Sequence, residues 1–121
     1  MKLAMGQFQM AFCRGNIHLV NFNPVKGGEI GKLRPAIIMS QDEDNEILPT
    51  IIVIPLSSVI EKNALPYRYM ISKREKLEKD SDACINELRA LSKNRVKDKI
   101  ASLQNSELKI IQKSLCQLVT N

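Results

Sequence analysis

The sequence is poor in aromatic residues. It contains no tryptophan, and aromatic residues make up 4% of its 121 residues. Proteins that hold a single nucleic-acid strand mainly by stacking need several exposed rings, so a binding mode based mainly on stacked bases is disfavoured. Hydrophobic residues nevertheless amount to 44%, which suffices for the core of one domain without disulfide or metal staples.

Cysteine and histidine are also scarce. The three cysteines, Cys13, Cys84 and Cys116, form no C-x-x-C pair, and His18 is the only histidine. This spacing predicts neither a disulfide framework nor a zinc site. We therefore expect reduced thiols in a cytoplasmic protein that needs no metal or cofactor. A nucleophilic pair of Cys13 and His18 has no third member or oxyanion motif to support it.

Long hydrophobic runs are missing as well. No stretch of 18 apolar residues occurs, and the apolar residues of 1–10 are interrupted by Gly6, Gln7 and Gln9. Neither a membrane span nor a signal peptide is predicted. We interpret residues 1–12 as an N-terminal extension outside the fold and residues 13–121 as a single domain.

Two loops also lack the motifs that would bind a phosphate or a metal. The glycine-rich segment 25–33 is no P-loop, because no G-K-S/T follows a strand. The acidic segment 40–49 lacks the D-x-D-x-D-G spacing of a calcium loop. We expect the second segment to be a solvated loop.

Positive charge is present in excess and is unevenly placed. The formal net charge is +5, and residues 61–121 hold 13 of the 18 Lys and Arg against 8 of the 13 Asp and Glu. The first half is therefore neutral. A basic surface of this kind fits a polyanion or an acidic protein partner, although solubility alone also explains many basic surfaces.

Short apolar runs rich in β-branched residues predict strands, and the C-terminal pattern predicts a helix. The expected strands are 17–22, 35–39, 50–54 closed by Pro55, 67–72, 83–91 in one or two pieces, and 98–103, with a helical turn at 92–96. Ser106 is the expected N-cap of the helix. Its apolar stripe falls at Leu108, Ile111, Leu115 and Leu118. The predicted fold is a small mostly-β barrel or α+β domain with a C-terminal amphipathic helix.

Several short motifs follow one another in a specific order. These are Arg14-Gly15, G-G-E-I-G-K-L-R-P at 27–35, A-I-I-M-S at 36–40, T-I-I-V-I-P-L-S at 50–57, K-D-S at 79–81 and E-L-R-A-L at 87–91. In this order and with these loop lengths, residues 14–119 resemble the MazF/PemK family of toxin endoribonucleases. The resemblance implies an SH3-like barrel, a homodimer, an acidic antitoxin partner and metal-independent cleavage of single-stranded RNA.

The resemblance also implies a catalytic pair. The Arg of the R-P motif maps onto Arg34, and the Ser or Thr after the central strand maps onto Ser57. RNA carries its own nucleophile, the 2′-OH, so an enzyme need only align it and stabilise charge on the phosphoryl oxygens. Arg34 offers charge-assisted donors for that phosphate, and Ser57 can hydrogen-bond it. The implied products are a 2′,3′-cyclic phosphate and a 5′-OH.

Other residues are candidate RNA contacts or loop positions around this pair. Arginine is always protonated, so the proton acceptor must be another group, for which Glu29 and Glu87 are candidates. The glycine-rich loop is a candidate lid over the phosphate. The full set of candidate binding or loop residues is Asn16, Gly28, Glu29, Gly31, Lys32, Pro35, Glu87 and Arg89, with Lys73, Arg74 and Lys93 as further basic candidates.

The chain departs from the usual family pattern at two places. It has Arg14-Gly15-Asn16 where the family usually has R-G-D, and Asn86-Glu87 where the family usually has E/D-Q. We expect these changes to affect RNA specificity more than activity. Two alternatives remain open: a binding toxin on the same barrel that resembles the gyrase poison CcdB, and a non-catalytic nucleic-acid module.

Overall fold

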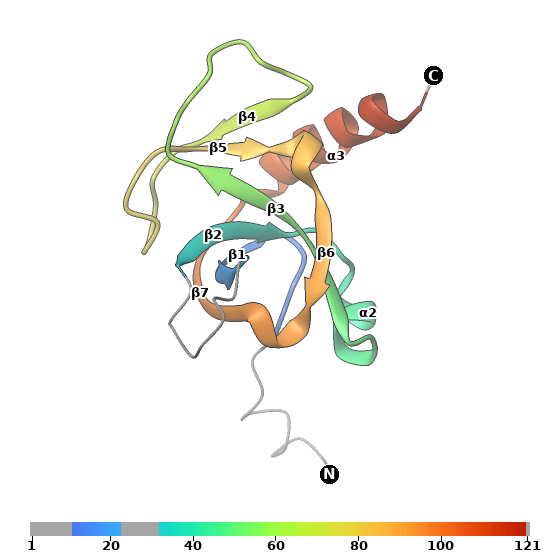
Figure 1. Ribbon diagram of the computed structural model, residues 1–121. Helices are drawn as coiled ribbons and strands as arrows, with labels where there is room; N and C mark the ends of the chain where they lie inside the picture. Colours follow the sequence, from blue (N-terminus) through green and yellow to red (C-terminus); the bar gives the residue numbers. More distant parts are fainter. Residues whose placement is uncertain (1–10, 23–31, 121) are drawn as a thin grey trace.

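The computed structural model describes residues 11–22 and 32–120. Within these residues the chain forms strands, α-helices and short 3-10 helices (Figure 1). In chain order they are β1 Asn16–Asn21, β2 Leu33–Ile38, α2 Asp42–Ile47, β3 Thr50–Ser57, β4 Arg68–Ile71, β5 Ser81–Cys84, η2 Ile85–Glu87, β6 Arg89–Ser92, η3 Lys93–Arg95, β7 Val96–Ser102 and α3 Asn105–Val119. The glycines and Glu29 of the predicted lid lie outside the described residues.

The seven strands form one antiparallel sheet. Their order is β4-β5-β3-β2-β1-β7, with β6 paired to β3. The sheet curves so that β1, β2, β3, β6 and β7 surround a common interior, while β4 and β5 extend away from it (Figure 1). The prediction of a mostly-β, barrel-like fold with a C-terminal helix is confirmed.

The two faces of the curved sheet bury separate groups of apolar residues. Because side chains alternate along a strand, Ile37 of β2 belongs to one group, whereas its neighbours Ala36 and Ile38 belong to the other. The first group lies beneath α3 and includes Ile111, and the second fills the barrel interior and includes Val53. Arg34 is two residues before Ala36 in β2, so its side chain lies on the same face of the sheet as Ala36, the face that lines the barrel interior.

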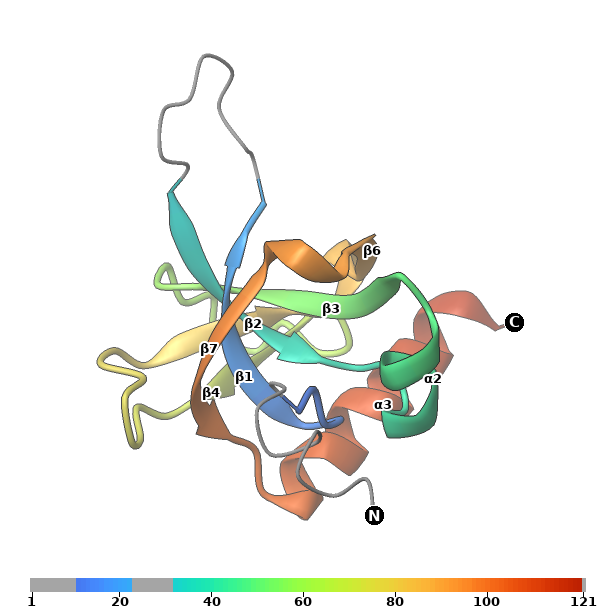
Figure 2. The same cartoon turned by 90° about the horizontal axis from the view of Figure 1, so that it is seen from below.

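Helix α3 packs on the outside of the barrel (Figure 2). Its predicted apolar stripe is confirmed, since Ile111 is fully buried and the other three members pack against the same core. The predicted N-cap is wrong by two residues. The cap is Gln104, and a capping box joins it to Glu107, whose carboxylate accepts the Gln104 backbone N–H at 2.8 Å. None of the helices in the described residues is long and apolar enough to cross a membrane.

The acidic segment 40–49 is a short helix, α2, where a loop was predicted. Its first turn carries Asp42, Glu43 and Asp44, and negative charge is favourable at that end of a helix. The buried Asn45 side chain donates hydrogen bonds to the carbonyl oxygens of Phe12 at 2.7 Å and Ser40 at 3.0 Å. The acidic residues are thus one solvated side of a helix that Asn45 anchors.

Strand β3 continues past Pro55, although that proline was expected to close it. β3 pairs with β6 through residues 50–53 and with β5 through residues 56–57. Pro55 falls in the gap between these two partners, where the missing N–H costs no ladder hydrogen bond. β3 therefore reaches Ser57 as a strand residue.

His18 is a fully buried residue of β1, as its predicted place in the barrel wall requires. Its Nδ1 lies 2.7 Å from the carbonyl oxygen of Lys97, so Nδ1 carries the proton and donates it. Nε2 has no hydrogen-bond partner among the described residues, and the ring packs against Phe12 at a centroid distance of 5.4 Å. Burial lowers the pKa of His18, and the charge of Lys99 acts in the same direction.

This arrangement predicts a loss of stability in mild acid. A lowered folded-state pKa means that the unfolded chain binds more protons below the ordinary value of 6.5, so stability is full above that value and falls as the pH decreases. Urea denaturation at about pH 7 and about pH 5 should show a smaller difference for His18→Gln than for the wild type. An unchanged difference would assign the acid sensitivity to other groups.

Candidate functional site

Arg34 and Ser57 are brought together by the pairing of β2 with β3. The two strands are antiparallel, with Ala36 opposite Pro55. The recorded pairs end there. Continued by two residues, this register would set Arg34 opposite Ser57, with both side chains on the face of Ala36 and Pro55. The β2–β3 pairing therefore brings the two residues to the same end of the strand pair and to the same face.

Each member of this pair has donors available to a ligand. Arg34 is exposed at the start of β2, and Ser57 is half-buried at the end of β3. The Oγ atom of Ser57 accepts the backbone N–H of Val59 at 3.1 Å. Because Oγ acts as an acceptor in this contact, its own hydrogen remains free to donate.

Strand β5 adds a carboxylate beside Ser57. Asp82 stands directly opposite Ser57 in the β3–β5 ladder, and only 1% of its surface is exposed. Its Oδ2 accepts the backbone N–H of Glu61 at 2.8 Å and lies 3.5 Å from Nη1 of Arg68. This ion pair was not among the predicted site residues. The sequence offered one sign of Arg68, which is a polar residue in a strand of alternating pattern. It offered none for Asp82, because β5 is buried at every position and shows no alternation.

Cys84 is a buried residue of β5, two positions after Asp82. Burial raises the pKa of its thiol, the positive charges of Arg68 and Arg34 lower it, and the charges of Glu87 and Asp82 raise it. These opposing effects show that all four charged groups are within electrostatic reach of one sulfur atom. The charges of the predicted residues Arg34 and Glu87 thus act on the same thiol as those of the unpredicted pair of Arg68 and Asp82.

Three further predicted residues lie on β2, directly before it, and on β6. Lys32 is exposed immediately before β2, and Pro35 is half-buried within it. Arg89 stands opposite Val53 in the β3–β6 ladder, and its guanidinium carbon lies 5.5 Å from the ring centroid of Phe22. Arg89 therefore extends the basic face of Arg34 toward the barrel opening, with the cation held over an aromatic ring.

Asn16 is placed apart from Arg34. In the β1–β2 ladder Arg34 stands opposite Val20, so Asn16 lies four residues further along β1, which is about 13 Å. Its Oδ1 accepts a hydrogen bond from the hydroxyl of Ser102 at 3.4 Å. The structure gives this residue a contact between β1 and β7.

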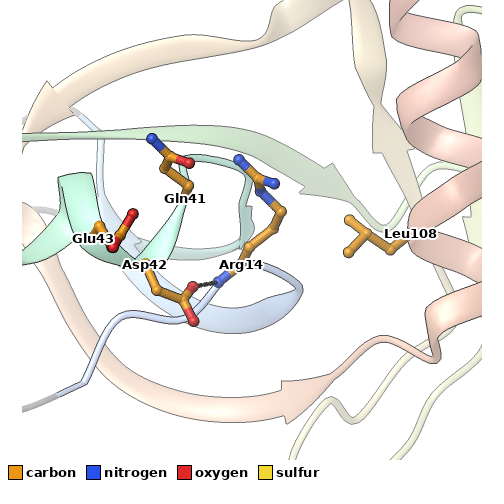
Figure 3. Close-up of a pocket in the computed structure, with 5 residues that line it drawn as sticks. All are labelled: Arg14, Gln41, Asp42, Glu43 and Leu108. Carbon is orange, nitrogen blue, oxygen red and sulfur yellow. Dashed lines mark hydrogen bonds between the residues drawn. The ribbon is translucent and has the colours of Figure 1, made fainter.

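A hollow of about 380 Å³ lies near that remote end of β1, between α2 and α3 (Figure 3). The backbone N–H of Arg14 donates to Asp42 at 2.8 Å, and its Nε donates to the carbonyl oxygen of Met39 at 2.8 Å. Gly15 follows with φ of +92°, a value that favours glycine. The Arg14-Gly15 motif therefore fixes the chain at the entry to β1.

Arg74 has a structural partner. Its Nη2 donates to Oε2 of Glu107 at 2.8 Å, and its Nη1 donates to the other carboxylate oxygen. The two side chains expose 18% and 13% of their surface. This bidentate pair joins the β4–β5 connection to the first turn of α3, so the guanidinium is occupied by protein.

The fold is shared with solved structures of toxins and toxin–antitoxin complexes. The structure of MazE–MazF from Deinococcus radiodurans matches with a TM-score of 0.74 and 20% identity over 92% of this chain and 97% of that chain. MazF alone from the same organism gives 0.73 and 20% identity, over 92% and 98%. These similarities establish a shared architecture.

Sequence comparison establishes the family. The sequence profile of PemK-like, MazF-like toxins of type II toxin–antitoxin systems matches residues 13–119. The endoribonuclease MazF of Staphylococcus saprophyticus is 35% identical over 103 residues, which cover 84% of this chain and 86% of that protein. The chain belongs to the PemK/MazF family of type II toxins, as its motifs predicted.

The pairing of Arg74 with Glu107 predicts a loss of stability when the arginine is removed. Arg74→Met should lower the free energy of unfolding by about 2 kcal/mol, because the largely buried carboxylate of Glu107 loses its charged partner. Chemical denaturation measures this change. RNA affinity at a permissive temperature should stay at the wild-type value, and a selective loss of RNA affinity with unchanged stability would contradict the structural role.

Proposed function

We propose that this toxin is a metal-independent, sequence-specific endoribonuclease that cleaves single-stranded RNA. The observation that carries the proposal is the cross-strand position of Arg34 and Ser57 on one face of the sheet. The named relative with 35% identity is an endoribonuclease. Cleavage of RNA by this chain would require a binding site for the scissile phosphate. Arg34 and Ser57 supply the hydrogen-bond donors of that site.

The reaction follows from the chemistry of RNA. The 2′-OH loses its proton and attacks the adjacent phosphorus, and the bond to the 5′-oxygen breaks. The departing 5′-oxygen takes a proton from solvent, so the products are a 2′,3′-cyclic phosphate and a 5′-OH. The guanidinium of Arg34 stabilises the negative charge that develops on the phosphoryl oxygens. The Ser57 hydroxyl donates to the same phosphate and fixes its orientation, so that the attacking oxygen and the leaving oxygen remain in line.

The proton of the 2′-OH needs a separate acceptor. Glu87 is an exposed carboxylate at the end of η2, and its charge and that of Arg34 both act on the pKa of the Cys84 thiol. Asp82 is less suited, because it is buried and its Oδ2 already accepts two contacts. We assign the acceptor role to Glu87 among the described residues, and Glu29 remains the alternative from the sequence.

The proposal includes an acidic antitoxin partner, a homodimer and a cytoplasmic site of action. Structures of family relatives include complexes of MazF with MazE. The net charge of +5 favours an acidic partner. Two exposed apolar side chains of the β3–β4 connection, Val59 and Tyr67, are offered as part of a surface for association.

The activity is tested with long single-stranded RNA in the presence of EDTA, followed by mapping of the cut ends. Wild-type protein should cut at a short recurring motif, and Arg34→Ala should reduce the rate at least about 100-fold, because a charge-stabilising donor is lost. A substrate with a 2′-deoxy nucleotide at the cut site should remain intact.

Two outcomes would overturn the assignment. Intact RNA after incubation with the folded wild-type protein would favour a toxin that acts only by binding. Cleavage of the 2′-deoxy substrate at the same position would exclude attack by the 2′-OH.

A further inference from the structure

Arg68 is held in one orientation by contacts of two of its three guanidinium nitrogens. Nε lies 3.4 Å from the carboxylate of Glu61, and Nη1 contacts both Asp82 at 3.5 Å and the carbonyl oxygen of Val59 at 3.1 Å. The side chain is 21% exposed. Among the described residues, Nη2 makes no recorded hydrogen bond or ion pair. A guanidinium fixed in this way can donate to an anion through Nη2.

The position of Arg68 relates it to the proposed cleavage site. Arg68 stands opposite Cys84 in the β4–β5 ladder, and Asp82, two residues earlier on β5, stands opposite Ser57 in the β3–β5 ladder. All of these side chains therefore project from the same face as Arg34. β2 and β4 are separated by three strand spacings, or about 14 Å, a gap that two long arginine side chains can narrow from both sides.

A hollow beside Arg68 offers space for a ligand. It has a volume of about 650 Å³ and is lined by residues 60–65 of the β3–β4 connection and by residues 68–70 of β4. Its wall includes the exposed apolar side chains of Ile60, Leu65 and Met70. A charged donor at the edge of a partly apolar hollow of this size matches the two parts of a nucleotide, its phosphate and its base.

We propose that Arg68 binds a second phosphate of the RNA strand, next to the phosphate held by Arg34 and Ser57, with Asp82 as its positioning residue. The proposal rests on the ribonuclease function proposed above. The base attached to this phosphate enters the hollow lined by residues 60–65. The buried carboxylate of Asp82 prevents Arg68 from turning away, whereas the exposed pair with Glu61, whose side chain is 62% exposed, contributes little.

The test measures how RNA affinity depends on salt. The probe is a short single-stranded RNA that contains the mapped cut site with a 2′-deoxy nucleotide at that site. Each phosphate contact contributes about 0.7 to the slope of log K against log salt for a single strand. Arg68→Gln should lower the slope by about that amount and weaken binding on the order of tenfold at physiological salt.

Matched variants separate a local contact from a general charge effect. Lys113→Gln removes the same charge from an exposed position on α3 and should leave the slope near the wild-type value. Arg68→Lys keeps the charge and should keep most of the slope. Asp82→Asn should weaken binding less than Arg68→Gln, and the double variant should bind no more weakly than Arg68→Gln, because Asp82 acts through Arg68.

The outcomes distinguish this inference from the proposed activity. If the wild type cuts RNA but folded Arg68→Gln retains the wild-type slope and affinity, the second phosphate site is wrong and the activity stands. The same conclusion follows if Lys113→Gln lowers the slope as much as Arg68→Gln. If the wild type neither cuts nor binds RNA, the proposed function itself fails. Circular dichroism and thermal unfolding of each variant exclude loss of fold as the cause.

Discussion

The pairing of β3 with two sets of neighbours is the constraint on which the site depends. One edge of β3 pairs with β2, whereas the other pairs first with β6 and then with β5. Because a shift by one residue would turn every side chain to the opposite face, the buried residues on both faces of β3 fix its register. The same register sets Ser57 opposite Asp82 on one side, and on the other side it places Ser57 and Arg34 two residues past the last pair of β3 with β2.

The division of the core into two groups explains how polar side chains can occupy a strand that is otherwise buried. One face of β3 packs beneath α3, and the other contributes to the barrel interior. Toward the end of β3 the interior face is no longer covered by apolar residues from β6, because that pairing stops at Val53. Ser57 and Arg34 therefore emerge at the border of the core, where rigid strands hold them but solvent reaches them.

Patterns of hydrophobicity predicted most of the elements and their type. Hydrophobic patterning alone was enough to predict the strands around residues 17–22, 35–39 and 50–54 and the apolar stripe of α3. All of these are present. The helix α2 was missed because its acidic residues resemble a loop, and its stability comes from the tertiary contacts of Asn45 with Phe12 and Ser40. The cap of α3 was misplaced because Ser106 is the commoner capping type, whereas the observed box needs the spacing from Gln104 to Glu107.

The candidate site was only half visible in the sequence. Arg34 and Ser57 belong to motifs that mark the family, whereas Arg68 and Asp82 acquire their place from the β4–β5 and β3–β5 ladders. A buried aspartate cannot be told from a solvated one by composition. Its partner, the backbone of Glu61, is 21 residues away and becomes a neighbour only after folding.

The central claim is that the β2–β3 register directs Arg34 and Ser57 to one phosphate. Single-turnover cleavage rates of the wild type, Arg34→Gln, Ser57→Ala and the double variant test it most directly. If both residues act on the same phosphate, the double variant should be slowed by clearly less than the product of the two single effects. Fully multiplicative effects would show that the two residues act independently, and would contradict a shared phosphate site.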